Sequence, residues 1–161
     1  AKRVQGEIAD AVVKMKEDHG VTPGLAAVLI GENPASQMYV KMKQNRCAEV
    51  GFESFLHQHP GDITQEQLEE LIAELNADPK VHGILVQLPL PDHLDEEKAL
   101  HAINLDKDVD GFHPVNIGRL AMKGRDPLFI PCTPHGAMVL LEEAGATFEG
   151  AATAARKSVW R

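Results

Sequence analysis

Leu25-Ala26-Ala27-Val28-Leu29-Ile30 is the stretch that decides the fold of this chain. All six residues are apolar, and a glycine stands on either side of the run. A short continuous apolar run between glycines is typical of a strand that is buried on both faces, as in a parallel sheet. We therefore expect a parallel strand at 25–30, with helices covering both faces of its sheet.

The rest of the chain alternates between helical and strand patterns. Ser36 is expected to be the N-cap of the helix after this strand, and Thr64 with Gln67 fits a capping box for the next helix. The expected elements are, in chain order, a helix ending at Gly20, the strand 25–30, a helix at 36–50, a strand at 52–59, a helix through Leu75, a strand at 83–90, a helix from Asp95 through Ile103, a helical segment at 116–122 and a helix at 136–143, with a break at 131–134. This order predicts an α/β fold, a three-layer αβα domain with a mostly parallel sheet.

The composition of the 161 residues is typical of one soluble globular domain, with 43% hydrophobic and 25% charged residues. A formal net charge of -8 argues against a nucleic-acid partner, which would require a basic face. No apolar run approaches the roughly 20 residues of a membrane span, and no signal peptide is evident. Cys47 and Cys132 lie far apart without metal-type spacing, so we expect reduced thiols and a cytoplasmic location.

Polar residues at three places in the chain outline a candidate site. The loop Lys107 to Pro114 carries two carboxylates two positions apart, and its Gly and Pro hold it in shape so that a carboxylate can face a ligand. Gln87 is the one polar residue in the apolar run 83–91. Tyr39 and Lys43 are four apart on the expected second helix, so an aromatic ring and an ammonium group share one face.

Each of these residues also has an ordinary structural explanation. Lys43 has basic neighbours and is expected to be solvated on that account. Gln87 would point outward if its strand lay at an edge of the sheet, and Asp110 is a common residue for an Asp-Gly turn. From the residues alone, these alternatives stay open.

Other kinds of site fit the sequence poorly. The Asp-rich loop begins like a calcium loop, but its twelfth position is Ile117, where a bidentate Glu is required. His57 with His59, and Cys132 with His135, each lack a third metal ligand, so we expect no metal site. The sequence has no Gly-x-Ser-x-Gly elbow, no P-loop and no Gly-x-Gly-x-x-Gly turn, so it displays no hydrolase nucleophile and no dinucleotide site.

Taken together, the motifs resemble one known family in both order and spacing. The family is the bifunctional methylenetetrahydrofolate dehydrogenase / methenyltetrahydrofolate cyclohydrolase, and the resemblance covers residues from about 5 to 150. The segments that carry it are 30–43 (IGENPASQMYVKMK), 49–52 (EVGF), 83–91 (GILVQLPLP), 107–114 (KDVDGFHP), 116–120 (NIGRL) and 131–134 (PCTP).

The resemblance implies an enzyme of one-carbon folate metabolism that serves purine, methionine and histidine biosynthesis. It implies oxidation of 5,10-methylenetetrahydrofolate with NADP, or NAD in some members, followed by hydrolysis of the methenyl product to 10-formyltetrahydrofolate. It also implies a homodimeric full-length protein, a small-molecule folate substrate, and neither a nucleic-acid nor a membrane partner.

The same resemblance implies roles for individual residues. Lys43 would be the central catalytic residue, mainly in the hydrolysis step, and Gln87 would orient it. Tyr39 would stack against the folate, and Asp110 would hold the pterin ring. The remaining substrate-binding residues that it implies are Ser36, Val86, Leu88 and Pro89. No cofactor-binding residue is expected in this chain.

The chain departs from the family after Gly150. We expect a catalytic domain at 1–149 and an irregular tail at 150–161, where the family continues into a Rossmann domain that binds NADP. The chain is accordingly expected to be a fragment or an altered product, with negligible hydride transfer and weak hydrolysis. Two alternatives remain, namely a noncatalytic folate-binding module or inactive remnant, and the substrate domain of another two-domain dehydrogenase that acts on amino acids or shikimate.

Overall fold

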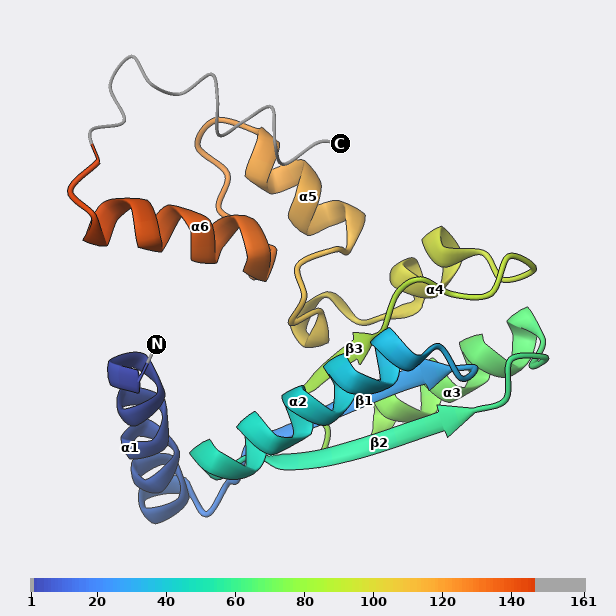
Figure 1. Ribbon diagram of the computed structural model, residues 1–161, viewed down its shortest axis with the longest axis horizontal. Coiled ribbons are helices and arrows are strands. Elements are labelled where there is room, and N and C mark those ends of the chain that lie inside the picture. Colours follow the sequence, from blue (N-terminus) through green and yellow to red (C-terminus); the bar gives the residue numbers. More distant parts are fainter. Residues whose placement is uncertain (1, 147–161) are drawn as a thin grey trace. The chain divides into compact units, whose positions relative to one another are not determined.

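The computed structural model describes residues 2–146 of the chain (Figure 1). It divides into two compact units, residues 1–109 and residues 110–161. Both units begin inside the predicted domain 1–149, whose boundary stays a prediction. The predicted tail at 150–161 lies outside the described residues.

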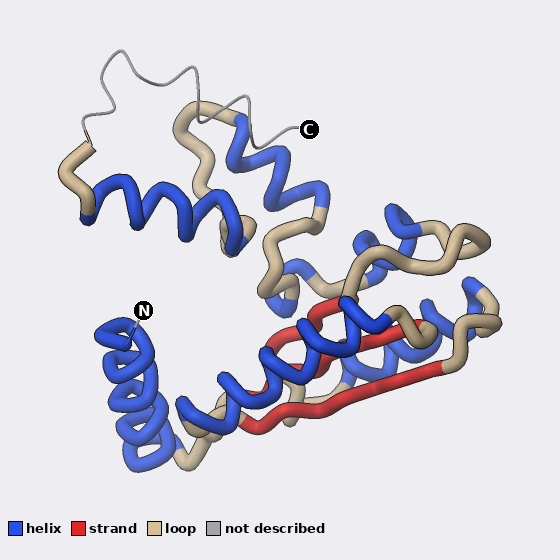
Figure 2. Tube along the Cα trace, viewed as in Figure 1, coloured by secondary structure: helices blue, strands red, loops and turns tan. Residues whose placement is uncertain are grey.

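The first unit is built on a three-stranded parallel sheet with the order β2-β1-β3 (Figure 2). The strands are β1 (Gly24–Ile30), β2 (Glu53–His59) and β3 (Gly83–Val86). In the centre, Ala26 of β1 pairs with Phe55 on one side and with Ile84 on the other. The apolar run at 25–30 is therefore the central strand, as a strand buried on both faces should be.

Helices lie on both faces of this sheet (Figure 1). Alternate side chains of β1 point to opposite faces, so Val28 joins one apolar cluster and Leu29 the other. The cluster of Leu29 includes Val40 from α2, and the cluster of Val28 includes residues of α3 and α4. The predicted three-layer αβα architecture is thereby confirmed. The helices of the first unit are α1 (Lys2–His19), α2 (Pro34–Val50), α3 (Gln65–Ala77), α4 (Glu96–Ala102) and the short 3-10 helix η1 (Leu105–Lys107).

The start of α3 follows the predicted capping box. Thr64 Oγ1 accepts a hydrogen bond from Gln67 N at 3.2 Å, and Gln67 Oε1 accepts one from Thr64 N at 2.9 Å. Leu68 and Ile72 of this helix are fully buried against the sheet. Asp95 likewise caps α4 by accepting a hydrogen bond from Lys98 N at 3.0 Å.

The predicted N-cap of α2 was wrong. Asn33, and not Ser36, caps the helix, because its Oδ1 accepts hydrogen bonds from Ala35 N at 2.9 Å and from Ser36 N at 3.1 Å. Pro34 occupies the first helical position, where its missing N–H costs nothing and its fixed φ suits the helix. Ser36 is consequently inside the first turn and is buried.

The strand predicted at 83–90 is shorter than expected. β3 ends at Val86, although Gln87 N still donates to Val28 O at 2.9 Å. Prolines at 89 and 91 have no N–H to give to a sheet, so the ladder cannot continue past this point. The Leu88-Pro89 peptide bond is cis.

The second unit contains α5 (Pro114–Ala121) and α6 (Cys132–Glu143) within the described residues 110–146. The break predicted at 131–134 was wrong, because α6 begins at Cys132 with Pro131 as its N-cap. Pro134 lies in the first turn of the helix, where backbone N–H groups have no partner within the helix. A proline there does not interrupt the hydrogen-bonding pattern.

Lys107 holds the C-terminal end of α3. Its Nζ donates to Leu75 O at 3.1 Å, to Asn76 O at 2.8 Å and to Asp78 O at 2.9 Å. These are carbonyls at the negative end of the helix dipole, where a cation is favourable.

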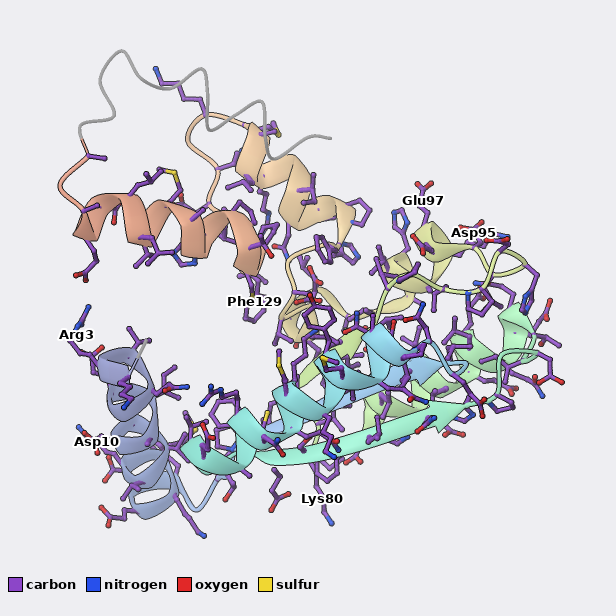
Figure 3. The ribbon with its side chains drawn as sticks, in the orientation of Figure 1. Arg3, Asp10, Lys80, Asp95, Glu97 and Phe129 are labelled. Atoms are coloured by element: carbon purple, nitrogen blue, oxygen red, sulfur yellow. The ribbon has the colours of Figure 1, made fainter. Side chains whose placement is uncertain are left out.

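Replacing Lys107 with methionine should therefore lower the free energy of unfolding by about 1–3 kcal/mol, since partly buried carbonyls lose a charged donor. Urea denaturation of the two chains measures the difference. Lys80 follows the end of α3 and its side chain is exposed (Figure 3). Lys80→Met is therefore the matched control and should leave stability nearly unchanged. Equal losses in both variants would contradict the proposed cap.

Candidate functional site

Helix α2 presents three of the predicted site residues. Ser36, Tyr39 and Lys43 are spaced by three and four positions, so they follow one face of the helix. Ser36 is buried, Lys43 is half-buried, and Tyr39 is 56% exposed. The helix thus places a phenol ring at the surface beside a lysine whose stem lies partly inside.

Lys43 and Gln87 meet although 44 positions separate them. Lys43 Nζ donates to Gln87 Oε1 at 3.2 Å. Gln87 Nε2 donates to Leu88 O at 2.7 Å, so the amide group is engaged on both sides. The alternatives of a simply solvated Lys43 and an outward-facing Gln87 do not describe the structure.

Gln87 is held at the carboxyl end of β3. Its backbone N–H bonds to Val28 O of the central strand, and its side chain then crosses to α2. Val86 before it is buried, Leu88 after it is half-buried and Pro89 is exposed. In α/β proteins, ligands bind outside the carboxyl ends of the strands, and the Lys43–Gln87 pair lies at that end.

The Asp-rich loop is fixed to the sheet as far as Val109. Asp108 is 1% exposed and forms a parallel bridge with Ile84 of β3. Val109 packs so closely on Gly83 that a Cβ on Gly83 would lie 2.5 Å from Val109 Cγ1. Asp110 is half-buried and belongs to the second unit. The structure therefore brings Lys43 and Gln87 together, while the role of Asp110 stays a prediction.

Thiols and metal ligands contribute little to this arrangement. Both cysteines are free, with Cys47 buried and Cys132 exposed. Burial raises the pKa of the Cys47 thiol, which keeps it protonated and unreactive at neutral pH. Among residues 2–146, no three His, Cys, Asp or Glu side chains come together as a metal site would require. No helix in the same range has the length and apolar character to cross a membrane.

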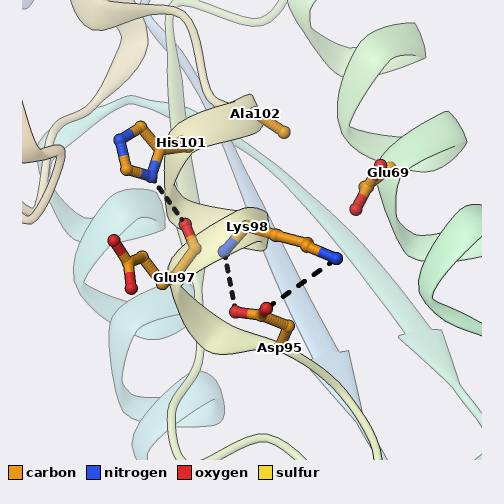
Figure 4. A pocket seen from close by; sticks show the side chains of 6 residues that line it. All are labelled: Glu69, Asp95, Glu97, Lys98, His101 and Ala102. Carbon is orange, nitrogen blue, oxygen red and sulfur yellow. Dashed lines mark hydrogen bonds and ion pairs between the residues drawn. The ribbon is translucent and has the colours of Figure 1, made fainter.

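A separate open groove of about 570 Å³ lies between α3 and α4 (Figure 4). Lining residues of α4 and its N-cap interact with each other. Asp95 accepts from Lys98 N at 3.0 Å, and His101 Nδ1 lies 3.1 Å from Glu97 O. None of the predicted site residues lines it. The groove is lined by Glu69, Asp95, Glu97, Lys98, His101 and Ala102.

Comparison with known proteins identifies the family. Residues 1–110 match the family described as tetrahydrofolate dehydrogenase/cyclohydrolase, catalytic domain. The chain belongs to the tetrahydrofolate dehydrogenase/cyclohydrolase family. The match includes Lys43, Gln87 and the loop up to Asp110, whereas the segments 116–120 and 131–134 that also carried the resemblance lie beyond it.

Relatives in this family are close in sequence and in structure. Bifunctional protein FolD of Moorella thermoacetica is 55% identical over 145 residues, which is 90% of this chain and 51% of the relative. Bifunctional protein FolD 2 of Arabidopsis thaliana is 53% identical over 150 residues, covering 93% of this chain and 50% of the relative. A solved structure of the Trypanosoma brucei methylenetetrahydrofolate dehydrogenase-cyclohydrolase, complexed with NADP cofactor and inhibitor, matches with a TM-score of 0.87 at 38% identity, covering 90% of this chain and 49% of that one. The chain thus spans about half the length of the relatives that it matches.

Two contacts, one in each unit of this member of the tetrahydrofolate dehydrogenase/cyclohydrolase family, were not anticipated from sequence. The carbonyl of Leu88 fixes the Gln87 amide, whereas Leu88 was expected only to line a pocket. Asn116 is fully buried in α5 and its Oδ1 accepts a hydrogen bond from Leu128 N at 2.9 Å. An amide residue early in a helix is an ordinary sequence feature, and only the tertiary contact distinguishes it.

Proposed function

We propose that this chain is the folate-binding catalytic domain of a bifunctional enzyme of one-carbon metabolism. Its own residues would carry the hydrolysis of 5,10-methenyltetrahydrofolate to 10-formyltetrahydrofolate. The observation that supports this proposal is the hydrogen bond from Lys43 Nζ to Gln87 Oε1 at the carboxyl end of β3. It provides a fixed proton-carrying group at the edge of the sheet where ligands of α/β proteins bind.

The chemistry requires one proton acceptor and one proton donor beside the same carbon. Water attacks the cationic methenyl carbon and loses a proton to the amine form of Lys43. The resulting ammonium then gives that proton to the pterin ring nitrogen as the carbon–nitrogen bond to it breaks. The hydroxyl on the same carbon loses its remaining proton to water and becomes the carbonyl, which leaves the formyl group on the other nitrogen. Gln87 keeps the amine directed at this carbon, because its own amide is held by Leu88 O.

The other predicted residues would bind the folate. Asp110 presents a carboxylate that can accept hydrogen bonds from the ring N–H and amino groups of the pterin. Ser36 would support Lys43 from the first turn of α2, and the segment Val86 to Pro89 would line the pocket. Tyr39, the most exposed of the three residues on the α2 face, would stack on the flat part of the substrate.

Replacing Tyr39 with alanine should weaken tetrahydrofolate binding by about tenfold, in the range of one lost aromatic contact. Isothermal titration of the 161-residue chain measures the change. Tyr39→Phe keeps the ring and should bind within about twofold of the parent chain. If phenylalanine and alanine weaken binding equally, the hydroxyl and not the ring plane is the important feature, and the stacking role fails.

NADP would serve the oxidation of 5,10-methylenetetrahydrofolate in the longer protein, where it accepts a hydride. We propose no NADP-binding residue in this chain. The turn from β1 to α2 is Gly31-Glu32-Asn33, which lacks the glycine-rich pattern that lets a backbone approach a pyrophosphate. No step of the proposed hydrolysis passes through this group.

The test of the proposed function is turnover by the 161-residue chain itself. The loss of methenyltetrahydrofolate absorbance should be faster with the chain than with buffer, and tetrahydrofolate should bind. Binding without turnover would favour the noncatalytic folate-binding module instead. Preference for an amino acid or shikimate over folate would favour the substrate domain of another two-domain dehydrogenase. Failure to bind any folate would overturn the proposal.

The cytoplasmic location and the homodimer of the longer protein stay predictions. Two free cysteines are consistent with a reducing compartment. The links to purine, methionine and histidine biosynthesis also stay predictions, because they depend on the proposed product, a formyl donor.

A further inference from the structure

We infer that Asn116 is a positioning residue for the carboxylate of Asp110, acting through the backbone of residues 128–131. The inference rests on the proposed function, in which Asp110 holds the pterin ring. All residues of this argument belong to the second unit.

Asn116 is buried inside the second unit. Its side chain is 0% exposed, and it is one of three buried polar residues within residues 2–146. Burial of an amide is unfavourable unless it forms hydrogen bonds, so its position is set by its partners. Asn116 Oδ1 accepts a hydrogen bond from Leu128 N at 2.9 Å, which fastens the loop after α5 back onto that helix.

The loop after α5 contacts the turn that follows Asp110. Gly111 has a φ of +69°, and a Cβ there would lie 2.7 Å from Pro131 N, 2.8 Å from the carbonyl carbon of Ile130 and 3.0 Å from Phe129 O. The backbone of 129–131 therefore packs against Gly111 and leaves no room for a side chain there. Glycine adopts a positive φ without steric cost, so it suits both this conformation and this close approach.

The two contacts link Asn116 to Asp110 through residues 128–131 and Gly111. Asn116 holds Leu128, the next three residues press on Gly111, and Gly111 is bonded to Asp110. Without the Asn116 bond, the 129–131 backbone can leave Gly111, and the Asp110 carboxylate loses its fixed direction. A ligand that binds that carboxylate then loses affinity, because binding must also order the side chain. The affinity of a ligand that does not contact it stays the same.

The test compares two ligands on the full 161-residue chain by titration calorimetry. Tetrahydrofolate contains the pterin ring, and p-aminobenzoylglutamate lacks it. Asn116→Ala should weaken tetrahydrofolate binding about tenfold, the size of one buried hydrogen bond, and change p-aminobenzoylglutamate binding less than about twofold. Asn116→Asp keeps an acceptor for Leu128 N and should recover most of the loss. In an Asp110→Ala background, Asn116→Ala should have no further effect on affinity.

Asn76→Ala is the matched control for a purely structural effect. Asn76 makes the same kind of clamp in the first unit, donating to Ala102 O at 2.7 Å and accepting from Asn104 N at 2.9 Å. It should lower stability without changing the ratio of the two affinities. A loss of both ligands in Asn116→Ala, or an undiminished effect in the Asp110→Ala background, would overturn the inference.

Hydrogen exchange of the parent chain provides a readout that does not depend on the variant folding. The Leu128 amide should exchange slowly. If it exchanges as fast as the amides of the exposed residues 123–126, the inference is wrong while the proposed function is unaffected. Failure of the parent chain to bind tetrahydrofolate would overturn the proposed function and this inference with it.

Discussion

Replacing Lys43 with methionine should lower the rate of methenyltetrahydrofolate hydrolysis by about 10²–10⁴-fold, the usual contribution of a positioned proton-transfer group. Methionine keeps the length and apolar stem of the side chain but can neither give nor take a proton. The stem of Lys43 is half-buried, so this substitution preserves packing better than alanine would. The rate is followed by methenyl absorbance, and circular dichroism checks that the fold is intact.

Lys41→Met is the matched control for this experiment. Lys41 lies on the same helix two residues earlier and is exposed, so its loss should leave the rate within about twofold of the parent chain. Gln87→Leu should lower the rate less than Lys43→Met, because it misdirects the amine without removing it. The double variant should be no slower than Lys43→Met alone, since both residues act in one step. Additive losses would show that they act separately, and an unchanged rate in Lys43→Met would remove Lys43 from the mechanism.

Gly24→Ala should destabilise the first unit by about 3 kcal/mol or more, at the upper end of overpacking effects. A Cβ at this position would lie 2.0 Å from Lys80 O and 2.9 Å from Phe55 Cε2. The backbone cannot easily retreat. Gly24 N donates to His82 Nδ1 at 3.0 Å, and Gly24 O accepts from His82 N at 2.8 Å. The first residue of the central strand is thus clamped against the loop before β3.

Gly6→Ala is the internal control for Gly24→Ala. Gly6 lies inside α1 with nothing within 4 Å of an added Cβ. Alanine there should raise stability by about 0.5–1 kcal/mol, because a helix interior favours alanine over glycine. Urea denaturation of the three chains measures both effects. Similar stabilities for Gly24→Ala and the parent would mean that the packing of Gly24 against Lys80 and Phe55 is looser than the structure shows.

The elements whose cause is local were predicted correctly from the sequence. The run at 25–30 predicted a strand buried on both faces, and it is the central strand. Thr64 with Gln67 predicted a capping box, because its two hydrogen bonds join residues three positions apart. Asp95 was recognised as the cap of α4 in the same way.

The errors arose where two local rules competed. Asn33 and Ser36 are both good N-cap residues, and the choice went to Asn33 because Pro34 suits the first helical position. Pro131 to Pro134 was interpreted as a break, although prolines fit a first turn as well as they fit a loop. Each pattern admits two local structures, and the sequence expectation chose the other one.

In the candidate site, too, some features are local and others depend on the tertiary structure. Sequence alone determined which residue types are available, and that Tyr39 and Lys43 share one helix face, because helical spacing is a local property. Tertiary structure decided that Lys43 Nζ lies 3.2 Å from Gln87 Oε1. That distance depends on β3 pairing beside β1 and on α2 packing over the same strand, and the β1–β3 pairing joins segments more than forty residues apart. Local chemistry fixes what each segment can form, and only the burial of their shared apolar faces brings the polar groups together.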